Sequence, residues 1–357
     1  MEESGHAVFG LLAQRGLGWF RSEQLNEIMD LLRSGPSQAP GPRPVRIRMR
    51  QRIQVGFGLL AILAAGMTLS AAWPSGLLLG EVDGDGKHSE TPLTAQQIHD
   101  LVDRALENQR HNDLMLDQYA RTEHSLFHGN GKEPDRDVVS RVIPAGQGII
   151  RVELERNGKT SDAAYLEEQW HGVAQALLAE AHGRYPHVGN FFETERHRRE
   201  RADMVTAIGK AFVFRWAGRV SMNGRPVVKL NFAPDPTYRS SARFAALYAH
   251  SRGTAWVDES SGQLIRAEAE LTDDVSWGAG IIAKLYRGGQ FTFEQREVAP
   301  NVWMPTHYSY DFDGRKFIFS LNVHERMEYT DYLRVGPPEE ALAVIRREHP
   351  SIFANQN

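Results

Sequence analysis

Apolar and polar residues alternate along most of residues 210–323. In the first segment Phe212, Phe214 and Trp216 are separated by single residues. This period of two is typical of a strand with one buried face. The Asn-Gly pair at 223–224 is the strongest short signal for a hairpin turn, because both residue types tolerate positive φ. Residues 228–232 then alternate again, so the sequence predicts a β-hairpin here.

The same alternation recurs further along the chain. We expect strands at residues 254–258, 264–271, 290–298, 307–312 and 316–323. Asp313 and Gly314 lie between the last two segments and predict a turn. The whole region is therefore expected to be a meander of antiparallel strands with one face more polar than the other.

Helical patterns and shorter strands precede this meander. Thr94 and Gln97 have the spacing of a capping box. One apolar stripe follows at helical spacing: Ile98, Leu101, Val102, Ala105 and Leu106. Strands are expected at residues 118–128 and 138–155, then a helix from near Ser161 and a highly charged helix over 189–207. This order of elements predicts an α+β fold, with helices on one face of an antiparallel sheet.

The N-terminal region has the pattern of an export signal. Four arginines fall in residues 46–52, an uncharged apolar run covers 53–72, and the run ends in Ser-Ala-Ala. A basic segment, an apolar segment and small residues are the parts of a secretory signal, and Met49 would begin one of ordinary length. The run is also long enough to remain as an inner-membrane anchor. In either case the basic flank directs the rest of the chain out of the cytoplasm.

These patterns divide the chain into five segments. Residues 1–48 are expected to be a disordered extension or a mis-assigned start, and 49–72 a signal peptide or membrane anchor. Residues 73–93 are interpreted as a linker, and 94–335 as the folded domain. Residues 336–357 are expected to be a C-terminal tail.

Composition narrows the function classes. The formal net charge is −4 and no long basic run occurs, which argues against nucleic acid as a partner. The chain has no cysteine, so disulfides, thiolate metal sites and a lipid-modified cysteine are excluded. We expect no cofactor.

Four stretches carry a resemblance to a known family. They read FRWAGRVSMNGRPVVKLNFAPDPTYR, GTAWVDESSGQLIRAEAELTDDVSWG, NVWMPTHYSY and ERMEYTDY. They resemble exported bacterial proteins related to the outer-membrane lipoprotein-sorting proteins, over roughly residues 94–332. The resemblance implies an incomplete antiparallel barrel that curves around helices and encloses an apolar cavity for acyl chains. The charged helical region around 193–201 departs from the dedicated lipoprotein carrier of that family.

The candidate binding residues are apolar side chains of the predicted sheet. The proposed cavity residues are Phe212, Phe214, Trp216, Leu230, Phe232, Trp256, Phe291 and Phe293. A buried acyl chain gains roughly 0.8 kcal/mol per methylene, so such a face could hold one without covalent chemistry. The alternative is that these side chains form an ordinary core beneath the helices.

The sequence gives less support for a catalytic or metal-binding function than for lipid binding. No HExxH, GxSxG or phosphate-binding loop occurs. Paired carboxylates could serve glycoside hydrolysis, and a cluster of them occurs at Glu268, Glu270, Asp273 and Asp274. Their alternation with apolar residues instead indicates the solvent-exposed face of a strand. His124 and His128 share a strand face but lie two pleats apart, so no metal site is predicted. An outer-membrane barrel is disfavoured by the helices within residues 161–207.

The sequence therefore predicts an exported, non-catalytic binder or carrier of a lipid or lipidated protein in the periplasm. Its partner would be an acyl chain, with membrane contact through residues 53–72 if these are not cleaved. The alternative is an envelope stress sensor or a protein-interaction module that uses the same half-barrel.

Overall fold

The computed structural model describes residues 91–128, 136–240, 245–277, 280, 283–317 and 319–353. The predicted extension, export signal and most of the predicted linker lie outside these residues. None of the described helices is both long and apolar enough to cross a membrane.

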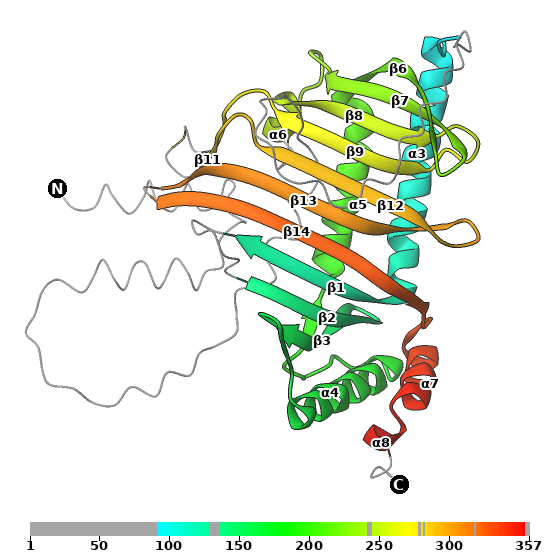
Figure 1. The fold of residues 1–357 in the computed structure, drawn as a ribbon, viewed down its shortest axis with the longest axis vertical. Helices are drawn as coiled ribbons and strands as arrows, with labels where there is room; N and C mark the ends of the chain where they lie inside the picture. The colour runs from blue at the N-terminus through cyan, green and yellow to red at the C-terminus, as the bar shows by residue number, and fades with distance from the viewer. Residues whose placement is uncertain are drawn as a thin grey trace, which may run out of the picture. The chain divides into compact units, whose positions relative to one another are not determined.

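Fourteen strands of the described residues form one antiparallel sheet (Figure 1). Along its main path the order is β4-β3-β2-β1-β14-β13-β12-β9-β8-β7-β6, so β4 and β6 are open edges. The strands are β1 (Tyr119–His128), β2 (Arg136–Ala145), β3 (Gly148–Arg156), β4 (Lys159–Thr160), β5 (Phe191–Glu193), β6 (Phe212–Met222), β7 (Arg225–Pro234), β8 (Ser251–Asp258), β9 (Leu264–Leu271), β10 (Val275–Trp277), β11 (Ala283–Leu285), β12 (Gln290–Ala299), β13 (Val302–Lys316) and β14 (Phe319–Arg334). The predicted α+β half-barrel is confirmed.

The helices cover both faces of this sheet, at different ends. They are α3 (Ala95–Met115), the short 3-10 helix η1 (Leu116–Gln118), α4 (Ala163–Ala181), α5 (Glu195–Ala211), α6 (Ala245–Ala249), α7 (Pro338–Glu348) and α8 (Pro350–Phe353). In Figure 1, α3 (cyan) and α5 (green) run behind the sheet, whereas α4 lies near β3 and α7 lies beside α4 and contacts β2.

Two hydrophobic cores result from this arrangement. The larger core joins α3 and α5 to the concave face of β6 to β14, and includes Leu101, Leu230 and Phe291. The second core joins α4 and α7 to β1, β2 and β3, and includes Ile150 and Leu177. Ile150 alternates with Arg151, which lines the concave side, so the second core lies on the opposite face.

Several local predictions are confirmed. Asn223 and Gly224 have φ of 53° and 76° and connect β6 to β7, as an Asn-Gly hairpin turn requires. At the start of α3, the Gln97 backbone N–H donates to Thr94 Oγ1 over 3.3 Å, and the Thr94 N–H donates to Gln97 Oε1 over 2.9 Å. This reciprocal pair is the predicted capping box.

The predicted turn at Asp313 and Gly314 is wrong. Strand β13 continues through both residues, and the chain turns near Phe317, whose φ is 55°. A Cβ on Gly314 would lie 2.3 Å from the carbonyl oxygen of Lys284 on the neighbouring β11. The glycine at this position therefore permits close strand approach instead of a turn.

Two element boundaries also differ from the sequence prediction. The charged helix begins at Glu195 instead of near 189, because residues 191–193 form β5 and pair with the edge of β3. The predicted C-terminal tail contains α7 and α8. Ala341 and Ile345 of α7 are buried in the second core, so these residues are packed against the domain.

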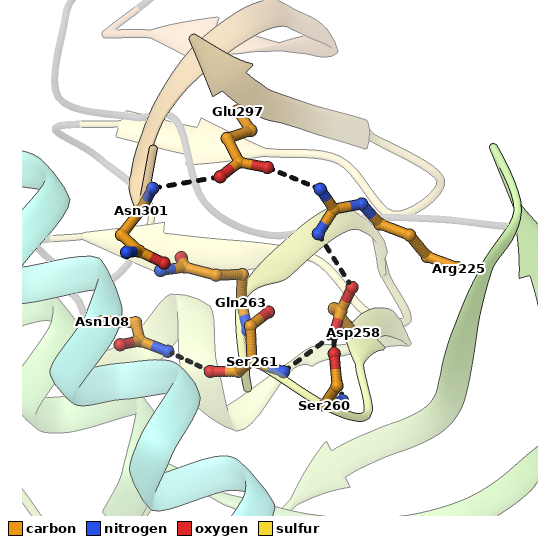
Figure 2. A network of polar contacts seen from close by, with 8 residues as sticks. All are labelled: Asn108, Arg225, Asp258, Ser260, Ser261, Gln263, Glu297 and Asn301. Atoms are coloured by element: carbon orange, nitrogen blue, oxygen red, sulfur yellow. Dashed lines mark hydrogen bonds and ion pairs between the residues drawn. The ribbon is translucent and has the colours of Figure 1, made fainter. Parts of the chain in front are cut away.

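A polar network ties α3 to one end of the sheet (Figure 2). The side chain of Asp258 is fully buried and accepts hydrogen bonds from the backbone N–H groups of Ser260 and Ser261. The Ser261 carbonyl in turn accepts from Asn108 Nδ2 of α3 over 3.0 Å. One turn later, Asn112 Nδ2 donates to Gln263 Oε1 over 2.9 Å. These contacts hold α3 across the concave face.

Candidate functional site

A cavity of about 330 Å³ lies between the concave face of the sheet and helices α3 and α5. This volume is at the lower end of the range of small-molecule pockets. Its walls come from α3, η1 and α5 on one side and from strands β1 to β3, β5 to β9 and β12 to β14 on the other. The cavity therefore spans most of the width of the sheet.

One end of the cavity is apolar. Six of the eight sequence-predicted residues line it: Phe212, Phe214, Leu230, Phe232, Phe291 and Phe293. They come from β6, β7 and β12, and the rings on β6 and β7 contact one another. The Phe232 ring centroid lies 5.1 Å from that of Phe212 and 5.9 Å from that of Phe214. These six predicted residues are therefore brought together on one wall.

The two predicted tryptophans do not line the cavity. Trp256 lies between Ala255 and Val257, which do line it, so strand alternation turns the tryptophan to the opposite face. There the amino group of Lys229 and the guanidinium of Arg266 each lie 5.5 Å from a Trp256 ring centroid. The prediction that Trp256 belongs to the concave face is wrong.

Trp216 lies on the same side as Phe214 but outside the cavity wall. It packs against the larger core, and the Arg219 guanidinium lies 4.9 Å from its ring centroid. The pairing register of β6 shifts between Trp216 and Gly218, which ends the regular aromatic row.

Tyrosines of β13 and β14 occupy the middle of the cavity wall. Tyr308, Tyr310, Tyr329 and Tyr332 line it. Burial is the largest influence on each hydroxyl and raises its pKa, so all four stay neutral and can donate hydrogen bonds at physiological pH. Tyr310 donates to Glu325 Oε2 over 2.7 Å, and Tyr332 donates to the Pro305 carbonyl over 2.6 Å.

The other end of the cavity is charged. Its lining residues include Arg121, Glu123, Ser125, Arg136, Ser140, Arg151 and Glu325. Arg136 Nη2 lies 2.7 Å from Glu325 Oε1, and Arg151 forms an ion pair with Glu123. Burial opposes ionisation of Glu123, but the guanidiniums of Arg151 and Arg121 outweigh it and lower the pKa of this carboxyl.

Polar side chains of η1 and the two covering helices face the same end. Asp113, Asp117, His197 and Arg201 line the cavity. Asp117 Oδ2 lies 2.8 Å from Nε of Arg198. Burial raises the pKa values of Asp113 and Asp117, and it lowers that of His197 in spite of the nearby Glu200.

The sequence prediction missed this charged end. Arg121, Glu123 and Ser125 alternate along β1, a pattern that also describes a strand face exposed to solvent. One signal in the sequence could have indicated it: Ile150 and Val152 of β3 are apolar and alternate with Arg151. In the structure, α4 covers these two apolar residues. A strand whose apolar side is already covered by a helix turns its charged side toward the concave face.

The carboxylates considered for hydrolysis lie away from the cavity. Arg266 pairs with Glu268, and Arg252 Nε donates to Glu270 over 2.8 Å. Asp274 Oδ2 forms an ion pair with Lys284 Nζ at 2.6 Å.

The histidine considered as a metal ligand has a carboxylate partner. His124 Nε2 lies 2.8 Å from Asp137 Oδ1. The described residues contain no group of three or more side chains arranged to hold a metal ion.

Comparisons with known proteins give structural neighbours only. No family model and no curated protein matches the chain. An outer membrane lipoprotein-sorting protein domain from Vibrio parahaemolyticus is similar at a TM-score of 0.27 and 11% identity, over 65% of this chain and 92% of that one. A LolA superfamily protein from Nitrosomonas europaea has a TM-score of 0.27 and 11% identity, over 67% of this chain and 93% of that one. A DUF1329 family protein from Desulfovibrio piger has a TM-score of 0.26 and 9% identity, over 67% of this chain and 92% of that one.

Proposed function

We propose that this protein is an exported, non-catalytic binder or carrier of a lipid or lipidated protein, and that it holds the acyl chain in the cavity under α3 and α5. The supporting observation is the wall of Phe212, Phe214, Leu230, Phe232, Phe291 and Phe293, which borders about 330 Å³ of open volume. An apolar core without a guest is normally packed to crystal-like density. Space beside so many aromatic rings therefore favours an apolar guest.

The energetics suit reversible binding. Each methylene that leaves water for this wall gains roughly 0.8 kcal/mol, so a short acyl segment offsets the entropic cost of association. No nucleophile or metal cluster is needed for such a role. Export is proposed from the basic and apolar pattern of residues 46–72, which makes the periplasm the compartment in which lipid would be met.

The test fills the cavity from one wall and measures binding of a neutral apolar fluorophore, N-phenyl-1-naphthylamine. Ala267 lines the cavity, and Ala267→Phe adds a ring to its wall. Thr292 lies between Phe291 and Phe293 on β12, so Thr292→Phe adds the same ring to the opposite face as a matched control. We expect about a tenfold weaker fluorophore affinity for Ala267→Phe, equivalent to about 1.4 kcal/mol, and no change for Thr292→Phe.

Thermal melting followed by circular dichroism checks that both variants fold. Equal fluorophore binding by the wild type and folded Ala267→Phe would place the binding site elsewhere. Absence of binding to the wild type would contradict the carrier role and favour the interaction-module alternative.

A further inference from the structure

The charged end of the cavity contains two arginines that the protein itself leaves incompletely paired. Four arginines line the cavity: Arg121, Arg136, Arg151 and Arg201. Arg136 and Arg151 are paired with Glu325 and Glu123. Within the described part of the chain, Arg121 and Arg201 form no ion pair. They are therefore the cations of this cavity that remain available to a guest.

Four carboxylates also line the cavity, but three of them are already held in ion pairs by other arginines. Glu123 and Glu325 are occupied by Arg151 and Arg136, and Asp117 is occupied by Arg198. Asp113 accepts a hydrogen bond from Gln109 Nε2 over 3.1 Å. Among the described residues that line the cavity, Asp113 is thus the single carboxylate outside an ion pair, against two arginines.

Unused hydrogen-bonding groups gather at the same end. Arg121 is only 8% exposed. Its Nε and that of Arg201 are buried without a hydrogen-bond partner among the described residues, as is Thr194 Oγ1. All three residues line the cavity. Because a buried donor without an acceptor costs free energy, this set favours a ligand that brings acceptors.

The elements explain why these groups share one location. Thr194, His197 and Arg201 fall at i, i+3 and i+7, so they share the cavity-facing side of the first turns of α5. Arg121 projects from β1 on the opposing wall. Both guanidiniums act electrostatically on Asp117 and on the Tyr308 hydroxyl, which line the same cavity.

We propose that Arg121 and Arg201 bind the anionic head of an amphiphile, a carboxylate or a phosphate, while its apolar chain lies along the phenylalanines at the other end. This inference rests on the proposed function and specifies its ligand class. Tyr308 lies between the two ends, with its ring centroid 4.9 Å from that of Phe293. An amphiphile with one anionic head and one chain matches this sequence of arginine, tyrosine and phenylalanine.

The test measures displacement of N-phenyl-1-naphthylamine by three ligands with the same chain: dodecanoate, dodecyl phosphate and dodecanol. At neutral pH the first two are anionic and the third is neutral. We expect the wild type to bind at least one of the anions about tenfold more tightly than dodecanol, the size of effect expected for charge-assisted hydrogen bonds. Inorganic phosphate alone should displace nothing.

Three variants and one control locate the effect. Arg121→Gln and Arg201→Gln should remove the preference for the anions and leave the affinity for dodecanol unchanged. Asp113→Asn removes a competing negative charge and should tighten anion binding alone. Arg199→Gln is the control, because its side chain is 74% exposed on the same helix and pairs with Glu195.

The possible results separate the two proposals. Equal affinity of the wild type for dodecanol and both anions overturns the anion site but leaves the apolar cavity intact. Displacement by inorganic phosphate, with loss of that effect in Arg201→Gln, overturns the amphiphile and indicates a free-anion site. Failure of all three chains to displace the fluorophore overturns both proposals. If either Gln variant is thermally destabilised, the comparison of dodecanoate with dodecanol on the wild type still tests whether the cavity prefers an anionic head.

Discussion

The two ends of the sheet have opposite polarity. At the end formed by β6 to β9 and β12, the concave face is aromatic and the outer face carries charges such as the Arg266, Glu268 and Glu294 cluster. At the end formed by β1 to β3, the concave face carries Arg121 and Arg151, and the apolar face is covered by α4 and α7. The polarity of the sheet is inverted from one end to the other.

This inversion shows what an alternating pattern does and does not determine. Alternation separates the side chains of a strand into two faces, but the helices decide which face is buried. Because α3 and α5 cover one face and α4 and α7 cover the other, one cavity is bordered by phenylalanines at one end and by arginines at the other. The cavity is amphipathic for this reason.

The largest expected effect is at the aromatic end. Phe291 is 1% exposed on the concave face, and Phe291→Ala should lower the free energy of unfolding by about 4 kcal/mol, as large-to-small changes of buried aromatics do. Trp256→Ala, on the outer face of the same end, should cost about 1 kcal/mol, the value of exposed cation–π contacts. Urea denaturation measures both. A larger loss for Trp256→Ala would contradict the assignment of faces.

A somewhat smaller effect is expected at the other end, on the other face. Ile345 of α7 is 1% exposed in the second core, so Ile345→Ala should cost about 3 kcal/mol in the same measurement. The exposed Arg347 of the same helix supplies a control, because Arg347→Ala should change the stability by no more than about 0.5 kcal/mol. A negligible effect of Ile345→Ala would mean that α7 behaves as part of the C-terminal tail predicted for residues 336–357.

The smallest effect is expected for the ion pair between Glu123 and Arg151, on the concave face of the end formed by β1 to β3. Glu123→Gln leaves Arg151 without its carboxylate and should cost about 2 kcal/mol at neutral pH, less than a fully buried pair because Arg151 is partly exposed. The pKa of Glu123 is lowered in the folded state, so its contribution exists above the unfolded value of about 4.3 and is lost as pH falls through the folded value.

Urea denaturation across a pH series checks this sign. The difference between wild type and Glu123→Gln should be largest near neutrality and shrink below about pH 4. A difference that grows on acidification would show that Glu123 is not held as a carboxylate. Glu153→Gln is a useful comparison, because Glu153 pairs locally with the more exposed Arg156.

Much of the fold could be predicted from local chemistry. The Asn223-Gly224 turn, the Thr94 capping box and the aromatic row of β6 each depend on residues close in sequence. The sequence prediction placed Trp256 on the wrong face of the sheet. Alternation along one strand separates two faces but does not indicate which face a helix covers. Gly314 was misread because its role depends on β11, whose close backbone approach is a tertiary contact.

The charged end could not be predicted in the same way. Arg121 and Arg151 are about 30 residues apart and meet Arg201 only across the cavity, in a fold whose strand order joins β1 to β14. Each residue alone has the sequence pattern of a solvated strand or helix face. The structure brings them together by covering the opposite side of β2 and β3 with α4 and α7.

Native mass spectrometry of the protein purified from the cells that naturally produce it tests the central claim most directly. We expect bound species that are released by organic solvent and that carry an apolar chain with an anionic head, and we expect Ala267→Phe to lose them. A wild-type protein that is free of such molecules, and that also fails to take up dodecanoate or dodecyl phosphate, would contradict the account.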